Sequence, residues 1–218
     1  MRSIHGSPSS SPSVPNVLFV AFALSFGVPF CVAAQADGVG ARTKGSPDAP
    51  VAMYEMSDFQ CPFCRDFALE TMPSLEREYI MAGKVRFVFI NLPLTGVHPN
   101  AMVAAEVAMC AARQGKFWPV HDRLFQRQRQ WADRQDPTPY LFALADSAGV
   151  AHAPLVDCVT RGATRPAIEA DAAAARRAGA QSTPTFYIEG GLIDGAAPLA
   201  AFREALDSVY QSKTASAR

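Results

Sequence analysis

The sequence lacks an excess of charge of either sign, and this argues against partners that are bound through their charge. Lys and Arg together number 20 in 218 residues, and so do Asp and Glu. Proteins that bind nucleic acid or an anionic membrane surface through their charge usually show a basic excess. The balance therefore predicts no nucleic-acid partner. Because 49% of the residues are hydrophobic and 18% are charged, most of the chain is expected to form a packed core.

The sequence also has little that could cross a membrane. Its N-terminal apolar run, VLFVAFALSFGVPF at residues 17–30, is shorter than the roughly 20 residues of a spanning helix and is interrupted by Gly and Pro. Ala-Gln-Ala follows at 34–36 and has the small-x-small pattern of a cleavage site. We therefore predict a cleaved signal peptide over residues 1–36 and export to the periplasm. A retained membrane anchor is the alternative.

Cysteine is scarce, and its spacing argues against a metal site. The chain beyond the signal peptide contains Cys61, Cys64, Cys110 and Cys158. A zinc ribbon needs a second close pair, whereas Cys110 and Cys158 are 48 residues apart. We predict no metal and no cofactor. An even number of cysteines in an exported chain favours disulfides, so Cys110 and Cys158 are expected to form a structural bridge. Two separately buried free thiols are the alternative.

Patterns of apolar and turn residues predict an α/β scaffold. Residues 37–50 are rich in Gly, Pro and small polar residues and are typical of a flexible linker. VAMYEMSDF (51–59) is typical of a buried strand, Pro62 suits the first turn of a following helix, and KVRFVFI (84–90) is a second buried strand. Residues 51–91 therefore predict a βαβ unit with a parallel strand pair.

A helical segment interrupts this scaffold. Residues 92–179 show no strand and several helical patterns, among them the apolar HPNAMVAAEVAMCAARQG. TPTFYIEGGLIDG then predicts a β-hairpin, and an amphipathic helix follows it. Residues 180–212 thus form the second half of the scaffold, and 213–218 are predicted to be a disordered tail. The fold class is α/β with an inserted all-helical domain.

The pair Cys61-Pro62-Phe63-Cys64 carries the chemistry. Cys61 is expected at the end of a strand and just ahead of a helix, whose first N–H groups and dipole favour a thiolate. Cys64, one turn along and more deeply placed, suits a resolving thiol. A structural disulfide is the less favoured alternative. The sequence therefore predicts a reversible redox centre, with Cys61 as the exposed nucleophile.

At these residues the chain resembles a known family. DFQCPFC after a strand, QGKFW and HDRLF in the helical segment, and STPT at 182–185 before a hairpin are similar to the DsbA-like branch of the thioredoxin superfamily, over about residues 46–210. The resemblance implies a thioredoxin fold and thiol–disulfide exchange on unfolded or reduced secreted proteins. It also implies a membrane redox partner that recycles the site, and a cis Thr183–Pro184 bond beside the cysteines.

The residues between the cysteines leave the direction of exchange open. DsbA has Pro-His at this place, and histidine can donate a hydrogen bond to the thiolate, whereas Phe63 cannot. Disulfide donation is the favoured function. A reductase or isomerase with the same site is the alternative, and a chaperone-like binding module is a further one. Because only a short tether precedes the fold, we expect a monomer rather than a dimeric isomerase.

Three side chains near the pair are further candidates. Glu55 shares a strand face with Val51 and Met53, so it is either buried with a raised pKa or solvated at an edge. In the buried case it is expected to exchange a proton with Cys64. Phe59 and Phe63 flank the reactive sulfur and are expected either in the core or in an apolar substrate groove.

Overall fold

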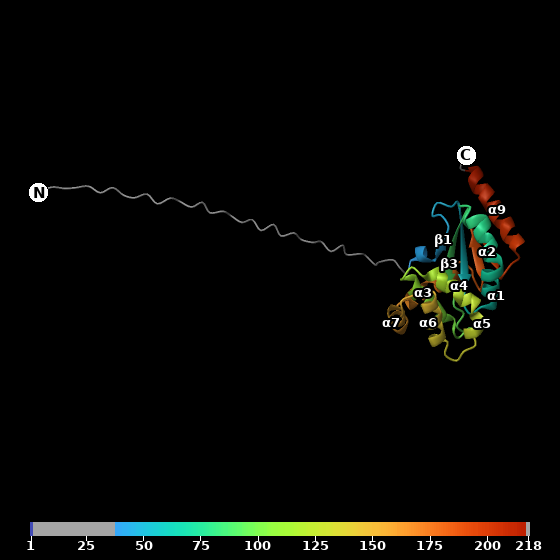
Figure 1. The fold of residues 1–218 in the computed structure, drawn as a ribbon. Helices are drawn as coiled ribbons and strands as arrows, with labels where there is room; N and C mark the ends of the chain where they lie inside the picture. The colour runs from blue at the N-terminus through green and yellow to red at the C-terminus, as the bar shows by residue number, and fades with distance from the viewer. Residues whose placement is uncertain (2–37, 217–218) are drawn as a thin grey trace. The chain divides into compact units, whose positions relative to one another are not determined.

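The computed structural model describes Met1 and residues 38–216. The predicted signal peptide, apart from Met1, lies outside the described residues. A five-stranded sheet with the order β1-β3-β2-β4-β5 forms the centre of the fold (Figure 1). Its strands are β1 Thr43–Lys44, β2 Val51–Ser57, β3 Val85–Asn91, β4 Thr185–Ile188 and β5 Gly191–Asp194. The pair β2–β3 is parallel and the other pairs are antiparallel.

The connections follow the predicted βαβ and ββα halves. A helical run links β2 to β3, in which α1 Pro62–Asp66 and α2 Met72–Leu75 alternate with the π-helical turns η2 Phe67–Thr71 and η3 Glu76–Ile80. Glu189 and Gly190 have φ of 45° and 96° and form the turn of the β4–β5 hairpin, which suits the right-handed twist of the two strands. The predicted α/β class is confirmed.

The helical segment is also confirmed. Residues 92–184, all of which are described, contain no strand. Their helices are α3 Ala101–Ala112, α4 Phe117–Gln126, α5 Gln128–Trp131, α6 Thr138–Ser147, α7 His152–Thr160 and α8 Arg165–Arg177. Helices α3 to α7 gather into a block at one end of the sheet (Figure 1), and α3 is buried almost all round.

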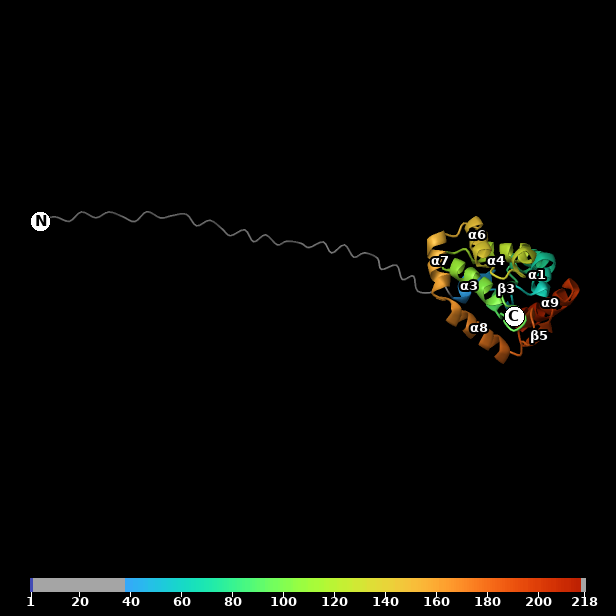
Figure 2. The ribbon, with the colours of Figure 1, turned by 90° about the horizontal axis from the view of Figure 1, so that it is seen from below.

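The two faces of the sheet are covered by different helices. On one face Val51 and Met53 pack with Phe202 and Leu206 of α9 Leu199–Ser216. On the other, Met56 packs with α8, and Figure 2 shows α8 and α9 on either side of β3. Since side chains alternate along a strand, Glu55 shares the face of Val51 and Met53. It therefore points toward the helical run that begins with Cys61 and Cys64.

The expectation of a flexible linker over residues 37–50 is wrong for its described part. Residues Val39–Arg42 form the 3-10 helix η1, and β1 pairs with β3. Arg42 is 2% exposed, forms an ion pair with Asp171 at 2.5 Å, and donates to the carbonyl oxygen of Phe89 at 2.9 Å. The buried ion pair binds this segment to β3 and α8, which composition alone does not reveal.

The disordered tail predicted over 213–218 is also wrong for residues 213–216. Helix α9 continues to Ser216, and Lys213 forms an ion pair with Glu189 of the hairpin turn at 2.7 Å. Residues 217–218 lie outside the described part. Within residues 38–216, no helix is long and apolar enough to span a membrane.

Candidate active site around the cysteine pair

Cys61 lies at the junction between β2 and α1. It is the N-cap residue of α1, with φ −68° and ψ 125°, and Pro62 occupies the first helical position. Its N–H donates to the carbonyl oxygen of Asp58 at 3.1 Å, which closes the turn between strand and helix. The N-cap position brings the cysteine sulfur close to the unpaired N–H groups of the first helical turn. The sequence-based placement of Cys61 is therefore confirmed.

The Cys61 thiol is unusually acidic. The pKa of Cys61 is lowered from 9.0 to about 6, and a hydrogen bond with the side chain of Cys64 is the largest cause. Burial opposes this shift, whereas Thr183 and the N–H groups of Cys64 and Phe63 add to it. A thiol with this pKa is about 90% thiolate at pH 7. The thiolate is the nucleophile in disulfide exchange.

The pKa of Cys64 is shifted in the opposite direction to that of Cys61. Cys64 is fully buried, and its pKa is raised well above 9.0. Burial is the largest cause, and the nearby Cys61 and Glu55 add to it. The N–H of Asp58 donates to its Sγ at 3.5 Å. Because one thiol is acidic and the other is held neutral, the pair is asymmetric in the way that stepwise exchange needs.

The expected exposure of Cys61 is not found. Cys61 is 3% exposed, since its Sγ lies 3.2 Å from the carbonyl oxygen of Thr183. The neighbouring Phe63 is 61% exposed. What distinguishes Cys61 from Cys64 is therefore its lowered pKa and its place at the helix start, not a large difference in accessible surface.

The Thr183–Pro184 peptide bond is cis, as the resemblance implies. It directly precedes β4, whose first residue pairs with Met56 near the end of β2, and so residue 183 lies beside the cysteine pair that follows β2. Thr183 is 6% exposed, and within residues 38–216 its buried Oγ1 has no hydrogen-bond partner. A hydroxyl beside the Cys61 sulfur is a potential donor to the thiolate.

Glu55 is buried rather than solvated. It is 1% exposed, and burial raises its pKa from 4.5 to about 8. In the described part of the chain its Oε1 has no hydrogen-bond partner. Its charge contributes to the raised pKa of Cys64, so the two groups interact across the interior. Of the two alternatives for Glu55, the structure has the buried one.

The two phenylalanines have different environments. Phe59 is 1% exposed and packs against Phe89, Phe125 and His121, with ring centroids 5.0, 5.2 and 5.7 Å away. Of the two alternatives for Phe59, the structure has the core, because three aromatic rings enclose it, and its assignment to a substrate groove does not hold. Phe63 keeps an exposed ring between the two cysteines.

Asp58 and His98 were not anticipated as a pair. The Asp58 carboxylate accepts hydrogen bonds from the N–H of Gln60 at 2.7 Å and of Leu94 at 2.8 Å, and its Oδ2 lies 2.8 Å from His98 Nδ1. An Asp three residues before the first cysteine is a signal for a turn. Nothing in the sequence marks His98, 40 residues later, as its partner.

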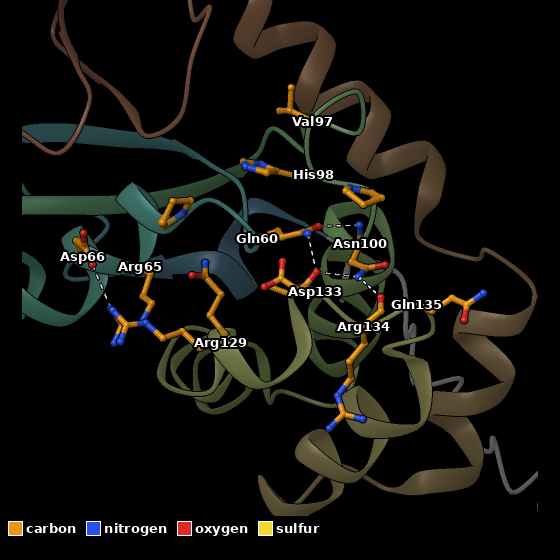
Figure 3. A pocket seen from close by; sticks show the side chains of 14 residues that line it. Gln60, Arg65, Asp66, Val97, His98, Asn100, Arg129, Asp133, Arg134 and Gln135 are labelled. Atoms are coloured by element: carbon orange, nitrogen blue, oxygen red, sulfur yellow. Dashed lines mark hydrogen bonds and ion pairs between the residues drawn. The ribbon is translucent and has the colours of Figure 1, made fainter.

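A polar cavity adjoins the cysteine pair. It has a volume of about 720 Å³ and is lined by Gln60 and Pro62, which flank Cys61, and by residues of the 97–100 and 128–135 segments. Figure 3 shows Gln60 at its centre, in contact with Asn100. Side chains from the helical segment thus form one wall of the site. Within residues 38–216, no group of three or more metal-ligating side chains is present.

The other two cysteines are bonded to each other. The sulfurs of Cys110 and Cys158 are 2.03 Å apart and the Cα atoms 5.9 Å apart. Cys110 lies in α3 and Cys158 in α7, both buried in the helical block. This bridge holds two helices of the insertion together.

Comparisons with known proteins agree with this geometry. The model of the thioredoxin family matches residues 38–208. The chain is 26% identical to the disulfide bond formation protein D of Bacillus subtilis over 176 residues, which are 80% of this chain and 79% of that protein. It is 36% identical to the Na(+)/H(+) antiporter NhaA 3 of Salinispora tropica over 187 residues, which are 81% of this chain but 25% of the antiporter. The chain spans only about a quarter of the length of such antiporters.

Solved structures show the same architecture. The crystal structure of oxidised BdbD from Bacillus subtilis superposes with a TM-score of 0.72 at 25% identity, over 79% of this chain and 95% of that one. The structure of α-DsbA1 from Wolbachia pipientis also reaches 0.72, at 21% identity and over 81% and 94% of the two chains. The fold is therefore that of the DsbA-like proteins, a thioredoxin fold with a helical insertion.

Proposed function

The chain belongs to the thioredoxin family, and from this premise we propose that it is a thiol:disulfide oxidoreductase that acts through Cys61 and Cys64. The observation that carries this proposal is the asymmetry of the pair. Cys61 is an acidic thiol at a helix start, and Cys64 is a buried thiol with a raised pKa. The similarity to a disulfide bond formation protein supports the same activity.

The proposed reaction proceeds in two exchanges. A substrate thiolate attacks Cys61 Sγ of the Cys61–Cys64 disulfide, a mixed disulfide forms, and Cys64 leaves as a thiolate that takes up a proton. A second substrate thiolate then attacks the substrate sulfur of the mixed disulfide and releases Cys61 as a thiolate. The substrate gains one disulfide and the protein becomes a dithiol. The reverse sequence reduces a substrate disulfide.

Glu55 is proposed to supply the proton for Cys64. With a pKa of about 8 it is mostly protonated at neutral pH, so it can donate to the leaving Cys64 thiolate and accept the proton in the reverse step. Because Glu55 and Cys64 are both buried, little water is available to exchange this proton instead. Thr183 and Pro184 are proposed to position the Cys61 sulfur, which lies against the Thr183 carbonyl oxygen.

Disulfide donation is the proposed direction, and the acidity of Cys61 sets a limit on its strength. Relative to a thiol of pKa 7, which is the thioredoxin value, a pKa of about 6 favours the reduced form about fivefold at pH 7, or about 20 mV. This contribution alone does not make a strong oxidant. A reductase with the same residues is therefore the second candidate function, since the pKa of Cys61 lies nearer to the thioredoxin value than to that of DsbA.

The proposed substrates are reduced or unfolded secreted proteins, which contact the exposed Phe63 ring as they approach Cys61. The proposed partners are these substrates and a membrane redox protein that reoxidises the pair, and the proposed state is a monomer in the periplasm. The transport activity in the antiporter's name is not extended to this chain, because the match covers only 25% of that protein.

The test is disulfide transfer to a reduced peptide with two cysteines. The oxidised protein is expected to lose its disulfide while the peptide gains one, as followed by intact mass. Cys61→Ser is expected to transfer nothing, and Cys64→Ser to accumulate a mixed disulfide. Transfer that persists in Cys61→Ser would exclude this site. A reduction potential above about −200 mV against glutathione supports donation, and one near −270 mV supports the reductase.

A further inference from the structure

Gln128 connects the helical block to the main chain that carries Cys61. Its side-chain Nε2 donates hydrogen bonds to the carbonyl oxygens of Phe59 and Cys61, both at 2.8 Å. Gln128 lies in α5 and is 4% exposed, so the two bonds are made in the interior. One amide group from the insertion thus holds two carbonyl groups of the active-site turn, 67 and 69 residues away in sequence.

The acidity of Cys61 depends on the conformation of this turn. The N–H groups of Phe63 and Cys64 help to stabilise the thiolate, and they do so only while the Cys61 side chain lies over the first turn of α1. That position follows from the backbone torsions at the N-cap. The directions of the Phe59 and Cys61 carbonyl groups depend on the backbone torsions of the same turn, and Gln128 binds both carbonyls.

Two other side chains hold the turn through hydrogen bonds to groups other than the Cys61 carbonyl. The Asp58 carboxylate binds the N–H groups of Gln60 and Leu94. The Gln60 amide donates to the carbonyl oxygen of Ala132 at 2.7 Å and accepts from the N–H of Asn100 at 2.7 Å (Figure 3). Among these three polar side chains, Gln128 is the one that binds the Cys61 carbonyl.

We propose that Gln128 is a positioning residue for the exchange reaction: by holding the Phe59 and Cys61 carbonyl groups it keeps the N–H groups of α1 directed at the Cys61 sulfur, and so sets the stability of the thiolate. The helical insertion thereby controls the redox equilibrium of a cysteine that belongs to the thioredoxin scaffold. This inference rests on the function proposed above, because it assigns a control to the same cysteine pair.

Gln128→Glu is the sharpest test, because it preserves the shape of the side chain and removes both donors. Its carboxylate oxygens would face two carbonyl oxygens, so the turn must move. We expect the pKa of Cys61 to rise from about 6 by about one unit. The thiolate fraction at pH 7 then falls from about 90% to about 50%, and the equilibrium constant for oxidation of glutathione by the protein falls about fivefold.

Two further variants define the comparison. Gln128→Asn keeps the amide donors on a shorter side chain that cannot reach both carbonyls, and is expected to shift both quantities in the same direction by a smaller amount. Gln126→Glu introduces the same chemical change at an exposed position two residues earlier, and is expected to match the unmodified protein.

The measurements are the pH dependence of Cys61 alkylation, read by peptide mass, and the equilibrium with glutathione, each on variants whose fold is checked by circular dichroism. A folded Gln128→Glu with the unmodified pKa and equilibrium constant overturns the inference, even if its melting temperature is lower. Should Gln128→Glu not fold, unchanged values in Gln128→Asn overturn it equally. If the unmodified protein does not exchange with glutathione at all, the proposed function itself fails, and that outcome is separate from the role of Gln128.

Discussion

The carbonyl oxygen of Thr183 lies 3.2 Å from the Sγ atom of Cys61, across 122 residues of sequence. In the neutral thiol the S–H group donates a hydrogen bond to this oxygen. Once the proton is lost, the carbonyl has nothing to accept, and the thiolate is stabilised instead by Cys64, by the Thr183 side chain and by the N–H groups of α1. Deprotonation therefore exchanges partners at the sulfur, and the chemistry of Cys61 depends on pH near neutrality.

The first prediction concerns the selectivity of alkylation in the reduced protein. Cys61 is expected to react at a rate that levels off above its pKa of about 6 and falls about tenfold for each pH unit below it. Cys64, with a pKa well above 9.0, is expected to react at least about a hundredfold more slowly at pH 7. Peptide mass spectrometry after brief iodoacetamide treatment measures both rates. Equal rates for the two cysteines would contradict the assignment of Cys61 as nucleophile.

The second prediction concerns the cost of ionising Glu55. Its pKa is raised from 4.5 to about 8 in the folded protein, so the stability associated with the neutral form is complete below pH 4.5 and is lost as pH rises toward 8. Glu55→Gln has no such loss. As pH rises across this window, the free energy of unfolding of Glu55→Gln is expected to increase relative to that of the unmodified protein by about 1.4 kcal/mol per pH unit.

Urea unfolding at pH 4, 6 and 8 measures this difference. Glu70→Gln, at an exposed position, is the matched control and is expected to show no comparable trend. A pH-independent difference between Glu55→Gln and the unmodified protein would show that Glu55 ionises normally.

The third prediction concerns the exposed residue between the cysteines. Phe63→His adds a donor near the Cys61 thiolate, and one charge-assisted hydrogen bond of about 1.5–3 kcal/mol would raise the reduction potential by some tens of millivolts. Phe63→Ala removes the ring without adding a donor and is expected to leave the potential near its original value. Equilibration with glutathione measures both, and an unchanged or lower potential in Phe63→His would dismiss Phe63 as a determinant.

The fourth prediction concerns the bridge in the helical block. Replacing Cys110 and Cys158 together by Ser is expected to lower the free energy of unfolding by about 4 kcal/mol, because the bridge closes a loop of 48 residues. The alkylation profile of Cys61 should not change, since the bridge joins α3 to α7 and neither of its residues is among the groups that shift the pKa of Cys61. In the protein without residues 1–36, which contain the fifth cysteine, mild reductant that opens Cys61–Cys64 should release two thiols after denaturation; release of four would show that the bridge is equally labile.

The order of elements and the reactive pair could be predicted from sequence, because both depend on neighbours along the chain. Alternation and turn residues mark β2, β3 and the β4–β5 hairpin, and Pro62 after Cys61 marks the start of α1. A cysteine at a helix start acquires its acidity partly from N–H groups within three residues of it. Even the burial of Glu55 was one of two alternatives that its strand face allowed.

Contacts between distant segments had no such local signal. Composition predicted a flexible linker before β2, yet the ion pair between Arg42 and Asp171 makes part of it an ordered element, and Phe59 entered the core because rings from β3 and α4 close around it. Asp58 contacts His98, and Gln128 binds the carbonyl of Cys61, only when the helical block is packed against the scaffold. The sequence by itself determined which cysteine lies at the start of a helix, and so which one is the proposed thiolate. The tertiary structure decided how that thiolate is held, because hydrogen bonds of about 3 Å between segments tens of residues apart exist only when the chain is folded.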